Sequence, residues 1–159
     1  KNNSSINNPS FSKIQNEVLQ MQKGETTLSD KHINEINKIV DHYAKENKIS
    51  PNLLKAVIKV ESNYNVKAIS NKGAKGLMQL MPSVLKDYKV NNPFSPDENI
   101  RAGSGLLKSL LKEYNFDYKK ALAAYNAGRK QVNNAQGVPN FKETKDFVQK
   151  VINSYMQNK

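Results

Sequence analysis

The sequence contains no cysteine, which excludes disulfide bridges and thiolate metal sites. It also lacks any apolar run that approaches the length of a membrane span. Arginine is scarce, since only Arg101 and Arg129 occur among 25 basic residues. Proteins that read nucleic acid usually use several arginines for bidentate contacts. We therefore expect neither a membrane span nor a nucleic-acid partner.

What is present suits one globular domain. The chain has 159 residues, of which 37% are hydrophobic and 25% charged. Its formal net charge is +11, which favours contact with anionic material such as an acidic cell-wall polymer. The first residue is Lys1 rather than Met, so we expect a processed or truncated product whose signal peptide would no longer be visible.

Hydrophobic spacing predicts a mainly helical domain over residues 29–159, preceded over 1–28 by an Asn/Ser-rich arm and a short helix. Any sheet would be small and lie near residues 65–79. Ser95 and Glu98 are expected to form a reciprocal capping box. Helices are expected from about residue 29, over 51–65, from Pro82 through Tyr88, from Ser95 through Tyr114, from Asp117 to near Gly128, and along a final apolar stripe from Phe147 to Met156.

Glu61 is the most unusual acidic residue. It follows Val57 by four positions and Ile58 by three, so it continues the apolar stripe of the 51–65 helix. A carboxyl group on such a face loses hydration, which raises its pKa and makes it a proton donor near neutral pH. The helix pattern alone favours the simpler interpretation, a Glu at a helix end that faces solvent.

Two further segments combine small and polar residues. Gln79 stands among apolar residues in the glycine-containing run 73–82, so its amide is either satisfied in the core or lines a cleft. Tyr125 and Asn126 end a run of small residues, where an aromatic face and an amide together suit a sugar ring, although an ordinary helix end explains them as well.

Metal and cofactor signals are weak. His32 and His42 are ten positions apart, without clustered carboxylates at ligand spacing. The i,i+4 pair of His42 and Glu46 is interpreted as a surface contact. We expect no metal and no cofactor.

Taken in order, these segments resemble the bacterial lytic transglycosylases of the soluble (SLT) type, relatives of goose-type lysozyme. The resemblance covers about residues 49–152. It is carried by Glu-Ser-Asn-Tyr-Asn at 61–65, Ala-Ile-Ser at 68–70, Gly-Ala-Lys-Gly-Leu-Met-Gln-Leu-Met-Pro at 73–82, Asn-Ile-Arg-Ala-Gly at 99–103, Ala-Ala-Tyr-Asn-Ala-Gly at 123–128, and a closing segment at 138–148.

The resemblance implies an all-α, lysozyme-like domain with a cleft for peptidoglycan glycan strands. It implies cleavage of the β-1,4 bond between N-acetylmuramic acid (MurNAc) and N-acetylglucosamine (GlcNAc), with 1,6-anhydro-MurNAc ends as products. Glu61 matches the single catalytic acid/base of the family. The substrate-binding positions that the resemblance implies are Ser70, Gln79, Met81, Tyr125, Asn126 and Phe147.

One position departs from the family. Phe147 stands where a tyrosine is usual, so the ring is kept and the hydroxyl is lost. A conventional glycosidase uses two carboxylates, and no second acidic residue lies in a recognisable motif near Glu61. A single carboxylate must then both donate and recover the proton.

Alternatives to a transglycosylase are a hydrolytic muramidase on the same scaffold and a non-catalytic cell-wall-binding module. The expected location is the periplasm or cell surface. Peptidoglycan strands are the expected partner, and other cell-envelope proteins are further candidates.

Overall fold

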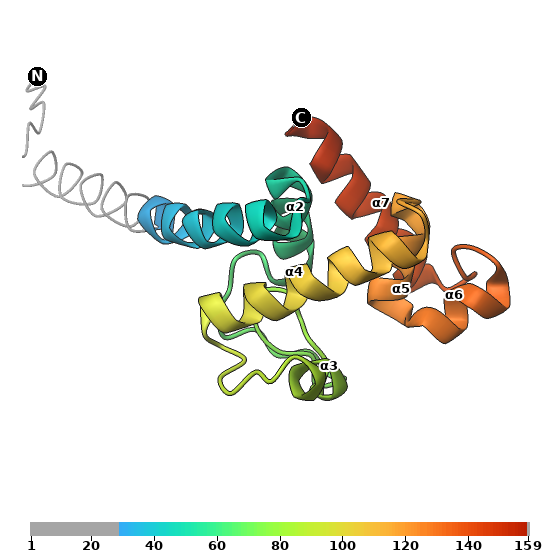
Figure 1. Ribbon diagram of the computed structural model, residues 1–159, viewed down its shortest axis with the longest axis horizontal. Coiled ribbons are helices and arrows are strands. Elements are labelled where there is room, and N and C mark those ends of the chain that lie inside the picture. Colours follow the sequence, from blue (N-terminus) through green and yellow to red (C-terminus); the bar gives the residue numbers. More distant parts are fainter. Residues whose placement is uncertain (1–28, 159) are drawn as a thin grey trace, which may run out of the picture. The chain divides into compact units, whose positions relative to one another are not determined.

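The computed structural model describes residues 29–158, and these are helical with irregular connections. The chain divides into two compact units, Lys1–Glu35 and Ile36–Lys159, and the site described below belongs to the second. The sequence-predicted arm and short helix over 1–28 lie outside the described residues. After a helix over residues 29–47 come α2 (Pro51–Ser62), α3 (Pro82–Asp87), α4 (Pro96–Glu113), α5 (Tyr118–Ala127), α6 (Arg129–Ala135) and α7 (Lys142–Gln157) (Figure 1).

The expectation of an all-helical domain is confirmed, since the described residues form no strand. The segment between α2 and α3 contains only isolated bridges, which join Ile69 to Lys75 and Lys75 to Leu80. This agrees with the prediction that any sheet would be small and lie near residues 65–79.

Local sequence explains where the helices begin. Proline occupies the first turn of α2, α3 and α4, where its missing N–H would have no partner in any case. The helix expected from Asp117 is present as α5, and Asp117 caps it, because its side chain accepts a hydrogen bond from the backbone N–H of Lys120. The helix predicted over 51–65 is confirmed but ends earlier, because Asn63 adopts a left-handed conformation with φ of 50°.

The capping box at α4 is only half formed. Ser95 Oγ accepts a hydrogen bond from the Glu98 N–H at 3.3 Å, as predicted. The Glu98 carboxylate does not return to Ser95; it accepts from the N–H of Asn91 at 2.8 Å instead. The prediction of a reciprocal partner was therefore wrong, because the loop before α4 offered Glu98 another unpaired donor.

Helix α6 was not predicted from the sequence. Its seven residues include two asparagines, and Val132 is its only buried residue, so it carries almost no hydrophobic periodicity. It begins directly after Gly128, whose φ of 92° turns the chain out of α5. It packs against α5, a tertiary contact that residue spacing within 129–135 does not reveal.

The core lies where α5 meets its neighbours, since α5 packs against α4, α6 and α7 and α2 packs against α7. Helix α2 contributes its predicted stripe, and Leu53, Leu54, Val57 and Ile58 are all buried. Helix α7 contributes Phe147, Val148 and Val151. Because α2, α5 and α7 share this core, residues at their ends are held at fixed positions relative to one another.

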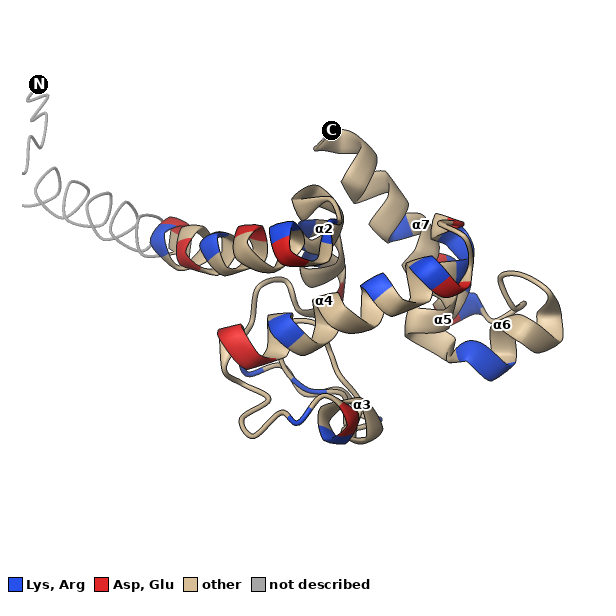
Figure 2. Cartoon of the chain, viewed as in Figure 1, with Lys and Arg blue, Asp and Glu red and all other residues tan. Residues whose placement is uncertain are grey.

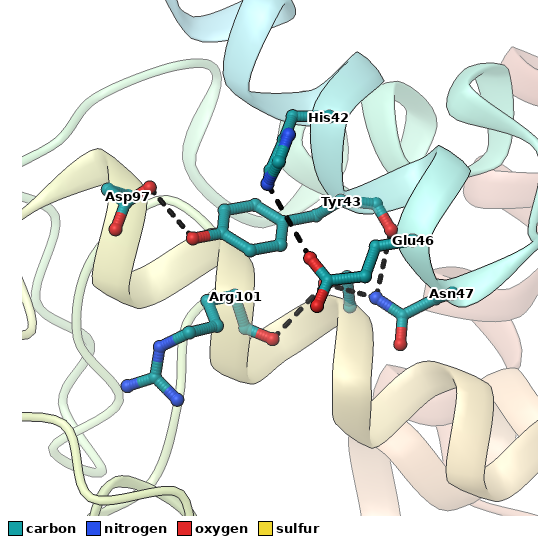
Figure 3. A network of polar contacts seen from close by, with 7 residues as sticks. His42, Tyr43, Glu46, Asn47, Asp97 and Arg101 are labelled. Carbon is teal, nitrogen blue, oxygen red and sulfur yellow. Dashed lines mark hydrogen bonds and ion pairs between the residues drawn. The ribbon is translucent and has the colours of Figure 1, made fainter.

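A polar network joins residues 36–47 of the first helix to α4 (Figure 3). The Tyr43 hydroxyl donates to Asp97 Oδ1 at 2.8 Å, and Asn47 Nδ2 donates to Ser104 Oγ at 3.2 Å. Burial, and then the hydrogen bond to Asp97, raise the pKa of Tyr43 to about 12. The hydroxyl therefore stays a neutral donor at physiological pH, which suits a structural role.

Asn99 fixes the irregular segment 66–81 against α4. Its side chain is fully buried; Oδ1 accepts from the Met78 N–H at 2.8 Å, and Nδ2 donates to the carbonyls of Lys75 at 3.0 Å and Pro93 at 2.9 Å. Gly76 packs against this amide, and a Cβ there would overlap Asn99 Nδ2. This one amide thus sets the position of the loop that carries half of the candidate site.

Candidate active site

Glu61 lies in the last turn of α2, directly after the buried stripe that ends at Ile58. Its side chain is partly buried. Burial, and to a lesser extent the charge of Glu143, raise the pKa of Glu61 to about 7. Among the described residues its carboxyl group forms no hydrogen bond or ion pair. Such a group can both donate and accept a proton near neutral pH.

A pocket of about 250 Å³ opens beside this carboxyl group. Six of the seven sequence-predicted site residues line it, although they come from α2, the 66–81 loop and α5. The lining consists of Glu61, Ser70, Lys72, Ala74, Gln79, Met81, Tyr125, Asn126 and Glu143.

Ser70 and Gln79 shape the loop side of the pocket. Ser70 Oγ accepts from the Ala74 N–H at 3.0 Å, which closes the turn around Gly73. Gln79 Nε2 donates to the carbonyls of Gly76 at 2.8 Å and Ala68 at 3.1 Å. Both alternatives for Gln79 therefore hold, since its amide is satisfied and also lines the pocket.

Tyr125 and Asn126 line the pocket from the end of α5. The Tyr125 hydroxyl donates to the Met78 carbonyl at 2.7 Å. Burial, and then the charge of Glu61, raise the pKa of Tyr125 well above its usual value, so the hydroxyl remains protonated. Asn126 Oδ1 accepts from the buried Thr144 hydroxyl at 2.9 Å, which ties the site to α7.

Phe147 is not part of the pocket lining. It is 5% exposed and stacks on Tyr125, with ring centroids 6.2 Å apart and ring planes at 9°. Of the seven predicted residues it is the one that the structure sets behind the pocket wall rather than in it.

Lys72 and Glu143 line the pocket but were not selected from the sequence. Lys72 Nζ donates to Glu143 Oε2 at 3.1 Å, which connects the 66–81 loop to the first turn of α7. No second acidic residue was expected in a recognisable motif near Glu61, but Glu143 lines the same pocket. Glu143 lies inside the closing segment, but the pattern gave no sign that this segment meets α2.

A second cavity, of about 710 Å³, shares Lys72, Met81, Tyr125 and Asn126 with the first. It extends past the start of α6, where Arg129 lines it. The two cavities are therefore adjacent, and together they offer room for a polymer larger than one ring. Met81 is 40% exposed and supplies an apolar surface at their junction.

Over residues 29–158, no group of three His, Asp or Glu side chains could hold a metal ion. His42 and Glu46 form the exposed surface pair that was expected, 3.5 Å apart. No helix in this range is long and apolar enough to cross a membrane.

Comparison with known proteins places these features in a family. The family model described as the transglycosylase SLT domain matches residues 38–148. The transglycosylase of Enterobacteria phage PRD1 is 41% identical over 85 residues, which cover 54% of this chain and 32% of the phage protein. The soluble lytic murein transglycosylase of Salmonella typhimurium is 29% identical over 140 residues, covering 73% of this chain and 22% of that protein.

A solved structure of a lytic transglycosylase is also similar to this chain. The lytic transglycosylase Slt from Pseudomonas aeruginosa, solved as an inactive mutant, superposes with a TM-score of 0.67 and 27% identity. The match covers 76% of this chain and 24% of that one. The chain thus spans about a third or less of each of these three relatives. Because the family model matches residues 38–148, which are most of this chain, the chain belongs to the transglycosylase SLT domain family.

Proposed function

We propose that this chain is a peptidoglycan lytic transglycosylase that cleaves the β-1,4 bond between MurNAc and GlcNAc and leaves 1,6-anhydro-MurNAc ends. The observation that carries the proposal is the partly buried Glu61 carboxyl at the pocket, with a pKa of about 7. At that pKa one group can serve as acid in the first step and as base in the second. Membership of the SLT family supports the substrate class.

In the first step, protonated Glu61 gives its proton to the glycosidic oxygen. The bond between that oxygen and MurNAc C1 breaks, and GlcNAc leaves with a free 4-hydroxyl. The MurNAc acetamide oxygen shields the positive charge at C1. In the second step, ionised Glu61 removes the proton of the MurNAc C6 hydroxyl, whose oxygen bonds to C1. The nucleophile belongs to the same sugar, so its effective concentration is high, and no water is consumed.

Pocket residues provide the contacts that this chemistry needs. Met81 offers an apolar surface to a sugar face, and the carbonyl oxygen of Gln79 remains available after its amide nitrogen is paired. The Tyr125 hydroxyl is engaged by Met78, so we infer that Tyr125 contributes its ring and its position rather than a proton. Phe147 supports that ring from behind.

Glu143 supports a second candidate, a hydrolytic muramidase. A hydrolase that uses two carboxylates needs one to activate water, and Glu143 lines the same pocket as Glu61. The two reactions differ only in whether water enters the product.

We place the protein in the periplasm or at the cell surface, where peptidoglycan lies. The net charge of +11 supports contact with an anionic wall. Other cell-envelope proteins remain candidate partners.

The test is digestion of purified peptidoglycan with the wild-type chain and with Glu61→Gln. Gln keeps the shape of the side chain but cannot transfer a proton, so soluble fragments should fall by about 100-fold or more, while binding to the sacculus is kept. Equal fragment release by both proteins would remove Glu61 from this role. Binding without fragments in the wild type would favour the wall-binding module.

A further inference from the structure

Glu143 is the second carboxylate of the Glu61 pocket. It reaches the pocket from the first turn of α7, whereas Glu61 comes from the last turn of α2. The two helices pack against each other, so the core sets where their backbones carry these two residues. Lys72 lines the same pocket and donates to Glu143 Oε2 at 3.1 Å.

We propose that Glu143 is a positioning residue that acts through Glu61, by holding a negative charge beside it in the pocket, and that the contact with Lys72 keeps it there. The proposal rests on the proposed function of Glu61. It assigns Glu143 no contact with the reacting atoms and no role in activating water.

The physical argument is the repulsion between like charges. A negative charge beside Glu61 disfavours its ionised form, and this acts in the same direction as burial. A group that must arrive protonated at a glycosidic oxygen benefits from both effects. The side chains of Lys72 and Glu143 are 74% and 65% exposed. Keeping the charge of Glu143 beside the pocket therefore requires little loss of hydration.

The charged and titratable groups facing Glu61 are few. The loop contributes Lys72, α5 contributes Tyr125 and α7 contributes Glu143. Tyr125 stays neutral, since its pKa lies well above the usual value. On α2 itself, Lys59 turns to Asn63 Oδ1 at 2.7 Å. Of these groups, Glu143 is the one whose negative charge raises the pKa of Glu61.

The test compares Glu143→Gln with Glu143→Asp. Gln keeps the length of the side chain and an oxygen for Lys72 but removes the charge, whereas Asp keeps the charge. Asp146→Asn is the matched control, because Asp146 is a second acidic residue of α7 that pairs with a lysine, Lys142, away from the pocket.

Two readouts are needed. One is the Glu61 pKa, followed by carboxyl ¹³C NMR of the full chain between pH 4 and 9. The other is the pH dependence of fragment release from peptidoglycan. Glu143→Gln should lower the Glu61 pKa without bringing it to 4.5, since burial remains. If the pKa of Glu61 falls by about 0.5, fragment release at pH values above that pKa should fall about threefold. Fragment release at lower pH should change little.

Glu143→Asp and Asp146→Asn should titrate as the wild type does. Added salt should reduce the difference between the wild type and Glu143→Gln, because exposed charges are screened. A Glu61 pKa unchanged by Glu143→Gln would overturn this inference and leave the proposed function standing. So would an equal loss of activity at every pH, since that indicates a structural or substrate-binding role. A wild-type Glu61 that titrates near 4.5 would instead remove the basis of the proposed function.

Discussion

Glu61 links the chemistry of the site to the stability of the fold. Its pKa is about 7 in the folded protein against an ordinary value of 4.5, so the folded state favours the protonated carboxyl. The stabilisation from this preference is complete below about pH 4.5 and is lost as the pH rises through 7. The loss can reach about 3 kcal/mol, because a pKa difference of 1 corresponds to about 1.4 kcal/mol.

Glu61→Gln should remove this dependence on pH. The variant stays neutral at every pH, so its stability relative to the wild type should rise between pH 5 and pH 8. Urea unfolding at the two pH values measures the difference. A constant difference between the two proteins would mean that the carboxyl titrates normally and is not partly buried in solution.

Phe147 is the position where the chain departs from the family resemblance. Its ring packs on Tyr125 and is almost fully buried, so a tyrosine keeps the stacking and adds one hydroxyl close to the pocket wall. Phe147→Tyr should change activity by several-fold while the unfolding free energy shifts by less than about 1.5 kcal/mol. Thermal unfolding and fragment release measure the two effects. A large loss of stability with unchanged activity would make Phe147 purely a core residue.

At the scale of the element, the 66–81 loop depends on Gly76. Its φ of 81° is costly for any other residue, and a Cβ would overlap both Asn99 Nδ2 and the Pro93 carbonyl. Gly73 has a similar φ of 89°, but a Cβ there meets nothing within 4 Å. Substitutions at these two glycines therefore distinguish the cost of backbone strain from the cost of steric overlap.

Gly73→Ala should cost about 1–2 kcal/mol of unfolding free energy, from the left-handed backbone alone. Gly76→Ala should cost at least about 2 kcal/mol more, because it also pushes the buried Asn99 amide away from its partners. Chemical denaturation of both variants gives the comparison. Equal costs would mean that the contact between Gly76 and Asn99 does not hold the loop.

The helices show which features of the fold can be predicted from the sequence and which cannot. The helix starts at Pro51, Pro82 and Pro96 follow from local rules of proline placement, and each is confirmed. Helix α6 was missed because one buried residue leaves no period to detect. The role of Glu98 was wrong because its partner, the Asn91 N–H, depends on the path of a loop.

The candidate site shows the same limit over longer distances. Resemblance to the family selected six of the residues that line one pocket. Lys72 and Glu143, which are 71 positions apart, were not selected, because a pairing between a loop and a distant helix leaves no local pattern. Distances across the pocket follow from the packing of α2, α5 and α7, which residue spacing alone does not specify.

For the whole molecule, charge is the feature that bears on binding. The net charge is +11, and Figure 2 shows basic residues on α3, α4, α5 and α6 rather than on a single element. Adsorption of Glu61→Gln, the variant expected not to digest its target, to purified sacculi should weaken as salt is raised from about 50 to 500 mM, since screening shortens the range of exposed charges. A co-sedimentation assay measures this. Binding that is flat across the series would mean that the charge does not contribute to wall binding.

The central claim is that Glu61 works with the C6 hydroxyl of the substrate and without water. Digestion of peptidoglycan in water enriched in ¹⁸O, followed by mass spectrometry of the fragments, tests it most directly. The account predicts ends of 1,6-anhydro-MurNAc, lighter by one water than hydrolysis products and free of ¹⁸O. Reducing ends that carry ¹⁸O would contradict it and would show that a water molecule is activated in the pocket that Glu61 and Glu143 share.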